Sequence, residues 1–182
     1  MSDELLIRCG SPTLAGIKTG NMFSYPYESR EEVTSALRRL NKILVPKGLR
    51  ILPLRYTDKT VLLYLYRIDA LRKDLSRQEA ADILREVGYK SSNSDRCVCD
   101  LISKLQNSVN FPHEVGLFLS YPPEDVRGFI DNHAKNCKYL GFWKVYGDVE
   151  KAKKTFAKYE RCTKVYRRKW SMGASLPSLI ID

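Results

Sequence analysis

The sequence contains no long hydrophobic run and no segment typical of a signal peptide. Its longest stretch of apolar and aromatic side chains, residues 61–66, suits a strand, whereas a membrane-spanning helix needs roughly 18 such residues. The first residues are acidic, where a secretory signal would be basic and followed by an apolar segment. We therefore expect a cytoplasmic protein that has no membrane partner.

Histidine is scarce, and the cysteines are not spaced as metal ligands. The chain has two histidines and five cysteines, and no C-x-x-C pair occurs. Cys97 and Cys99 are two positions apart on an expected helix, so their side chains diverge. An odd set of cysteines in a chain without an export signal is expected to be reduced. The sequence thus predicts no metal site and no cofactor.

Acidic residues are nearly absent from one segment of this basic chain. The net charge is +10, and residues 151–170 hold nine Lys and Arg against the single acid Glu160. Such a segment can bind a nucleic-acid backbone or an acidic protein, but charge runs are more often a solvated helix face. The aromatic residues of the helix predicted over 148–170 fall on one apolar stripe, so we expect them to face the core. The candidate surface residues are Lys154, Lys158, Arg161, Arg167 and Arg168.

Residues 29–67 predict a helix followed by a β-hairpin. Ser29 and Glu32 form a capping box before a helical pattern that runs to Leu44. Residues 49–56 and 60–67 are apolar and aromatic runs joined by three polar residues, which is typical of a hairpin. Proline at position 53 places the first run at a sheet edge, because proline donates no ladder hydrogen bond.

Two further regions predict strands beside helices. At the N-terminus, residues 5–7 are expected to form a strand that ends at Cys9, and residues 13–18 a short helix with Ser11 as its N-cap. Residues 115–119 are apolar on both faces, which is typical of a central strand. A helix beginning at a proline would then lead to a strand over 139–146, parallel to the earlier one through a right-handed crossover.

These patterns predict a mixed α and β fold. We expect a three-layer-like domain with a mixed sheet, an N-terminal β-hairpin, a C-terminal parallel β-α-β unit and helices on both faces. A single globular domain would cover residues 1–170, and residues 171–182 would form a C-terminal tail that wraps or frays.

Three segments carry a resemblance to a known family. Residues 9–18, 111–126 and 141–146 together resemble a family of uncharacterised bacterial proteins, domain of unknown function thirty-seven ninety-three. The resemblance covers nearly the whole chain and implies a single cytosolic domain without a known activity. Family members often have His before the cysteine where this chain has Arg8, which argues against a required base or ligand at that position.

Cys9 is the strongest candidate for chemistry. A cysteine that follows a strand and precedes a helix start is favoured as a thiolate by the helix dipole. His113 is its natural partner, since a Cys-His pair is the minimum for thiolate catalysis. The turn at residues 10–13 also offers backbone N–H groups to an anion. The predicted ligand-binding residues are Arg8, Ser11, Thr13 and Lys18.

Purely structural roles are an alternative explanation for Cys9 and for the segment around His113. A free cysteine is usually buried and inert, and Glu114 beside His113 suits an ion pair with a nearby Lys or Arg. Two classes of function therefore remain. One is a thiol-centred protein that binds or processes a small anionic ligand or is redox-active, marked by fast alkylation of Cys9 near neutral pH. The other is a non-catalytic module that binds protein or nucleic acid through helix 148–170. Neither pattern decides whether the protein is an enzyme.

Overall fold

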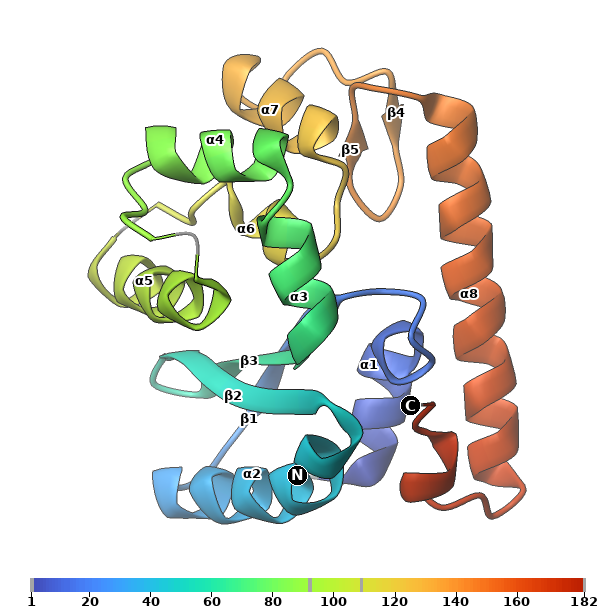
Figure 1. Cartoon of the computed structure of the whole chain (residues 1–182). Coiled ribbons are helices and arrows are strands. Elements are labelled where there is room, and N and C mark those ends of the chain that lie inside the picture. The colour runs from blue at the N-terminus through green and yellow to red at the C-terminus, as the bar shows by residue number, and fades with distance from the viewer. Residues whose placement is uncertain (1, 92, 109, 182) are drawn as a thin grey trace. The chain divides into compact units, whose positions relative to one another are not determined.

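The chain divides into two compact units. The computed structural model describes residues 2–91, 93–108 and 110–181. Unit 1 consists of residues 1–70 and 161–182, and unit 2 of residues 71–160. Two helices, α3 (Ile68–Leu75) and α8 (Val149–Ser171), contribute residues to both units (Figure 1). The predicted mixed α and β class is confirmed, while a single domain over residues 1–170 stays a prediction.

A three-stranded antiparallel sheet lies in unit 1. Strands β1 (Gly20–Pro26), β2 (Leu49–Tyr56) and β3 (Thr60–Arg67) pair in the order β1-β3-β2. The hairpin of β2 and β3 has the bounds predicted from the sequence. Pro53 lies on the edge strand β2, where a missing N–H leaves no gap in a central ladder.

One apolar cluster holds unit 1 together. Alternate residues of β3 (Val61, Leu63 and Leu65) join buried leucines of α1 (Asp3–Leu14) and α2 (Arg30–Leu44) in this cluster. Burying each such side chain contributes about 1.5–3 kcal/mol relative to leaving it in water. Helix α2 begins as predicted, because the Ser29 Oγ accepts a hydrogen bond from the Glu32 backbone N–H.

The C-terminal segment completes this cluster. Leu176, Leu179 and Ile180 are buried in it, and the Ile181 N–H donates to the Leu14 carbonyl at 3.1 Å. The Arg67 guanidinium also donates to the carbonyls of Leu14 and Ile181. Figure 1 accordingly draws the end of the chain beside α1. The described part of this segment therefore packs into the core of unit 1, while its separation from the domain as a tail over residues 171–182 stays a prediction.

Unit 2 contains short helices and a small hairpin. The helices are α4 (Gln78–Glu86), α5 (Ser94–Asn107), α6 (Val115–Phe118) and α7 (Pro123–Asp131), besides the parts of α3 and α8 that belong to the unit. Strands β4 (Tyr139–Leu140) and β5 (Lys144–Val145) form the antiparallel hairpin.

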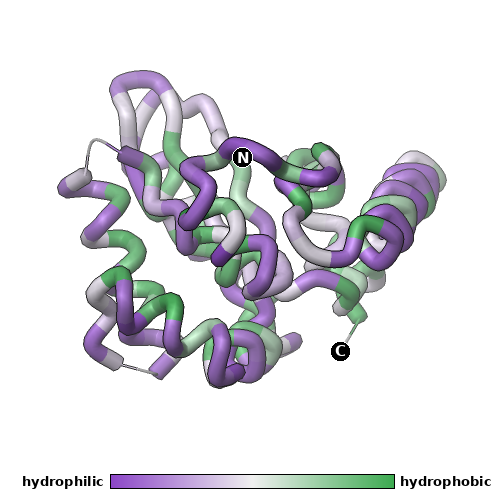
Figure 2. The backbone as a smooth tube through the Cα atoms, turned by 90° about the horizontal axis from the view of Figure 1, so that it is seen from above, coloured by the Kyte–Doolittle hydropathy of each residue, from purple (hydrophilic) through white to green (hydrophobic). Residues whose placement is uncertain are grey.

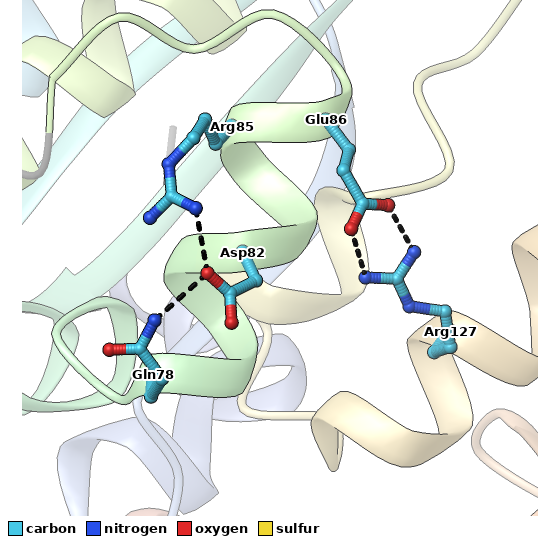
Figure 3. Close-up of polar contacts among 5 residues, drawn as sticks. All are labelled: Gln78, Asp82, Arg85, Glu86 and Arg127. Carbon is cyan, nitrogen blue, oxygen red and sulfur yellow. Dashed lines mark hydrogen bonds and ion pairs between the residues drawn. The ribbon is translucent and has the colours of Figure 1, made fainter.

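Polar contacts join α4 to α7 at the surface of unit 2. The Arg127 guanidinium on α7 donates two hydrogen bonds to the Glu86 carboxylate on α4 (Figure 3). One turn earlier, the Asp82 carboxylate accepts from Gln78 at 2.9 Å and from Arg85 at 2.8 Å. The hydrogen bond from Arg127 lowers the pKa of Glu86. The hydrogen bond from Gln78 lowers the pKa of Asp82.

The predicted parallel β-α-β unit is wrong. Residues 115–119 contain the helical turn α6 instead of a central strand, and residues 139–146 fold back on themselves as β4 and β5. An apolar run of five residues is compatible with a buried strand or a buried helical turn, so periodicity cannot separate them. Both sheets of the described residues are antiparallel. Helices on both faces of a sheet stay a prediction.

The N-terminal strand and turn are also wrong. Residues 5–7 lie within α1, which starts after Ser2, whose Oγ accepts a hydrogen bond from the Leu5 N–H at 3.4 Å. Ser11 is therefore an interior residue of the helix and not an N-cap. Gly10 is suited to this helix because a Cβ there would lie 2.5 Å from a Leu65 methyl group on β3.

Candidate functional site

Unit 2 contains an aromatic pocket. Its volume is about 260 Å³, and it is lined by the segment before α6, by α6 and α7, and by the β4–β5 hairpin. The rings that line it are Phe111, His113, Tyr121, Phe129, Phe142 and Trp143. Ring packing fixes the walls: Tyr121 stacks on Trp143 with centroids 4.7 Å apart, and His113 meets the edge of Phe129 at 5.1 Å. We call this cavity the aromatic pocket.

A buried carboxylate positions two walls of the aromatic pocket. Asp125, in the first turn of α7, is only 3% exposed. Its Oδ2 accepts from the Trp143 Nε1 at 2.7 Å, and its Oδ1 accepts from the backbone N–H groups of Tyr146 and Gly147, each at 2.7 Å. The positive end of the α7 dipole also favours an anion at this position. Asp125 thus ties the hairpin to α7 and already has three donors.

A lysine from the hairpin lies at the same pocket. The Lys144 Nζ donates to the Ala134 carbonyl at 2.7 Å and lies 5.8 Å from the centroid of the Phe129 ring. Ala134 has a φ of 62°, and its neighbours His133 and Asn136 also have positive φ. Left-handed backbone at several non-glycine residues is costly and is concentrated at functional sites. Lys144 therefore holds a strained loop and still has N–H groups to offer a ligand.

Glu114, next to His113, has a structural role. Its carboxylate is buried and lies 3.3 Å from the Lys104 Nζ, which also donates to the Val87 carbonyl. Burial, and after it the Glu114 charge, raises the pKa of the Tyr89 phenol nearby. The prediction that Glu114 pairs with a lysine or arginine is confirmed. His113, in contrast, lines the aromatic pocket, and its catalytic role stays a prediction.

The structural basis for activating Cys9 is absent. Cys9 lies inside α1, the seventh residue from its start, and is half-buried against the apolar cluster of unit 1. The helix N-terminus that would favour its thiolate is at Asp3 instead. Cys9 belongs to unit 1 and His113 to unit 2. Their joint role in catalysis remains a prediction without that support.

The residues predicted to bind an anion near Cys9 are mostly buried. The Ser11 Oγ donates to the Ile7 carbonyl of the same helix, and the Thr13 Oγ1 donates to the Asn21 Oδ1 at 2.7 Å. Burial lowers the pKa of Lys18 to about 8. Arg8 is exposed. The turn that would have presented free N–H groups is helical, so ligand binding by these four residues stays a prediction.

The basic segment forms the exposed side of α8. Hydrophilic residues predominate along this helix, which is seen nearly end-on at the right of Figure 2. Its predicted surface residues are all exposed; Lys154 and Lys158 belong to unit 2, and Arg161, Arg167 and Arg168 to unit 1. Phe156, Tyr159 and Tyr166 are buried, which confirms that the aromatic stripe faces inward.

Two kinds of site are not formed by the residues that the structure describes. They include no group of three His, Cys, Asp or Glu side chains placed to hold a metal ion. None of their helices has both the length and the hydrophobicity of a membrane span. The cytoplasmic location stays a prediction.

The fold and the aromatic pocket define a mixed α+β protein with a small apolar cavity of its own. Comparison with known proteins then places the chain: it belongs to the family described as "Protein of unknown function (DUF3793)", whose match covers residues 6–180. This confirms the resemblance found in the sequence. Searches of curated proteins and of solved structures return no match.

Sequence reasoning found only one residue of the aromatic pocket, His113. It missed Asp125, Phe129, Trp143 and Lys144, which line the same cavity. A usable signal was present, because aromatic side chains are concentrated between residues 111 and 143. The predicted parallel unit distributed these rings over two strands, a helix and the connecting loops, and that arrangement hid their convergence on one cavity.

Proposed function

We propose that unit 2 is a binding module for a small ligand that has one apolar ring and an anionic group. The observation that carries this proposal is the composition of the aromatic pocket: its walls are rings, and its polar groups are one satisfied carboxylate and two groups able to carry positive charge. Small-molecule sites have this character, mostly apolar with a few placed polar groups.

The size of the aromatic pocket supports a single-ring ligand. A volume of about 260 Å³ is near the lower limit of small-molecule pockets, which start at roughly 300 Å³. Aromatic rings bind a planar group by offset stacking or edge contacts. The stacked Tyr121 and Trp143 present such a surface without rearrangement.

The polar groups of the aromatic pocket favour an acid over an amine. Lys144 and His113 line the cavity, and a lysine ammonium has three donors, of which the Ala134 carbonyl takes one. Asp125 would attract a cation, but its oxygens are buried and already accept hydrogen bonds from three N–H groups, which leaves them less able to bind an ammonium group of the ligand. A carboxylate on the ligand therefore gains a charged donor at Lys144.

Intrinsic fluorescence provides a direct test. The chain has two tryptophans, so Trp170→Phe leaves Trp143 in the aromatic pocket as the only reporter. We would titrate this variant with 3-phenylpropionate, 3-phenylpropanol and 3-phenylpropylamine. The expected order of affinity is acid, alcohol, amine, with about a tenfold preference for the acid over the alcohol, the equivalent of 1.4 kcal/mol.

Two variants test the preference for an anionic group and the binding in the aromatic pocket separately. Lys144→Met should remove the preference for the acid while binding of the alcohol persists. Val115→Phe should fill the aromatic pocket and weaken all three ligands. Equal affinities for all three ligands in the parent protein would overturn the assignment of an anionic ligand, and absence of any binding would overturn the pocket itself.

A further inference from the structure

We infer that the exposed side of α8 between Arg161 and Lys169 binds the phosphate backbone of a nucleic acid without regard to base sequence. This surface belongs to unit 1 and is independent of the aromatic pocket. Its members are five exposed cations: Arg161, Lys164, Arg167, Arg168 and Lys169. We call it the cationic face.

Helical spacing gathers these charges. Arg161, Lys164 and Arg168 follow one another at intervals of three and four residues, which places them on one side of α8. Arg167 is three residues after Lys164 and borders the same side. Like charges at these intervals repel each other. An anionic partner would relieve that repulsion.

No ion pair among the described residues accounts for this concentration of charge. None of the five cations forms an ion pair with a residue that the structure describes. The negative end of the helix dipole stabilises cations only in the last turn, which includes Arg168 and Lys169 but not Arg161. The charges at the start of the cationic face therefore have neither an ion-pair partner in the described part of the chain nor the stabilisation of the helix end.

The cationic face fits a phosphate chain better than a bilayer. Tyr166 of this part of α8 is packed in the core of unit 1. Among the described residues from Arg161 to Lys169, Val165 is the one exposed large apolar side chain, which is too little apolar surface for insertion into lipid. Arg161 and Arg168 are about 10 Å apart along the axis at 1.5 Å per residue, a span of about three phosphates of one strand. Arginine also binds phosphate through two parallel hydrogen bonds.

Binding of the full chain to a fluorescent 20-nucleotide DNA, single-stranded or duplex, tests the inference by anisotropy. Five phosphate contacts predict a loss of affinity of about 500-fold between 50 and 200 mM salt for the duplex. The triple variant Arg161→Gln, Arg167→Gln, Arg168→Gln should weaken binding at 50 mM salt by at least about tenfold and reduce the salt dependence.

A matched control removes the same charge elsewhere in unit 1. Arg38→Gln, Lys42→Gln, Arg50→Gln changes three exposed cations on α2 and β2 and should leave binding within about twofold. Equal losses in the two triple variants would show attraction by net charge alone and overturn the cationic face. Tighter binding to phosphatidylserine vesicles or to polyglutamate than to DNA would overturn the nucleic acid as the partner, and circular dichroism would verify that both variants are folded.

Discussion

Unit 1 closes around an apolar cluster of strand and helix residues, whereas unit 2 buries two carboxylates, Glu114 and Asp125, among its short helices. Their charges differ accordingly. Unit 1 has sixteen Lys and Arg against eight Asp and Glu, a net +8, and unit 2 has fifteen against thirteen, a net +2. Among the described Lys, Arg, Asp and Glu residues of unit 1, only Lys18 is buried. Hence the charged groups of unit 1 lie mostly at the solvent-exposed surface and are mostly positive. In unit 2, buried carboxylates bind neighbouring elements and hold them in place.

Removing the Asp125 carboxylate should have the largest effect and should be confined to unit 2. Asp125→Ala leaves the Trp143 Nε1 and two backbone N–H groups without their acceptor, so we expect unfolding to become easier by about 4 kcal/mol. Each unit has one tryptophan, Trp143 or Trp170. Urea unfolding followed in the Trp170→Phe background reports unit 2 through Trp143. Hydrogen exchange of the β3 amides reports unit 1, because Trp143→Phe would itself remove one donor to Asp125. Asp131→Ala, at the end of the same helix, is the control, and an equal shift of both reporters would contradict the comparison.

The second prediction concerns the other buried carboxylate of unit 2. Lys104→Met leaves Glu114 buried without its cation, which should destabilise unit 2 by about 2–3 kcal/mol, because an uncompensated buried charge is costly. The double variant with Glu114→Gln should recover at least half of that loss. The free energy of unfolding from urea titration of the parent and of both variants measures this. No recovery in the double variant would show that Lys104 acts only through its bond to the Val87 carbonyl.

The third prediction is a variant of unit 1 that should stabilise the protein, whereas the two variants above should destabilise it. Burial lowers the pKa of Lys18 from 10.5 to about 8, so the unfolded chain binds more protons between these two pH values and stability rises with pH across this window. Below pH 8 the full penalty of a buried ammonium is present. Lys18→Met should therefore stabilise the protein at pH 7 by about 1–3 kcal/mol, and the difference from the parent should shrink by pH 10. Thermal unfolding at both pH values would detect it, and a less stable variant at pH 7 would contradict it.

The smallest effect is expected at the surface of unit 2. The hydrogen bond from Arg127 lowers the pKa of Glu86 (Figure 3), so this pair contributes above the ordinary carboxyl pKa and its contribution is lost as the pH falls through the lowered value. Because Glu86 is exposed, solvent screens the pair. Glu86→Gln should scarcely change the urea midpoint at pH 7, and this small effect should shrink further as the pH falls through the lowered pKa. A shift as large as that of Lys104→Met would show that the α4–α7 contact is essential to unit 2.

The central part of unit 1 was predicted from the sequence more accurately than unit 2 was. The hairpin of β2 and β3 was predicted to the residue, because two long apolar and aromatic runs flank a short polar turn. Helix α2 was found through its capping box. The error at α1 arose from residues 10–12, whose Gly, Ser and Pro are typical of a turn. The helical spacing of Leu6, Gly10 and Leu14, all buried, was the better signal.

The concentration of aromatic residues between positions 111 and 143 is visible in the sequence, but their convergence on one cavity could not be predicted, for a physical reason. Residues 115–119 carry no periodicity, and only packing decides whether such a short run becomes a strand or the turn α6. Once that turn is helical, the chain brings Phe111, His113 and Phe129 to one cavity. Long-range contacts, such as those of Asp125 with the hairpin, leave no mark in local sequence.

Unit 1 is formed by two separate segments of the chain, so its core cannot be completed until the second segment has been synthesised. Residues 161–181 emerge from the ribosome after all of unit 2, yet Tyr166, Leu176 and Ile180 belong to the core around β3. Until they arrive, the nascent sheet exposes the apolar groups that they will cover, for about five to twenty seconds at ordinary translation rates. A chaperone that shields exposed leucine and valine side chains would therefore meet the first seventy residues at this stage.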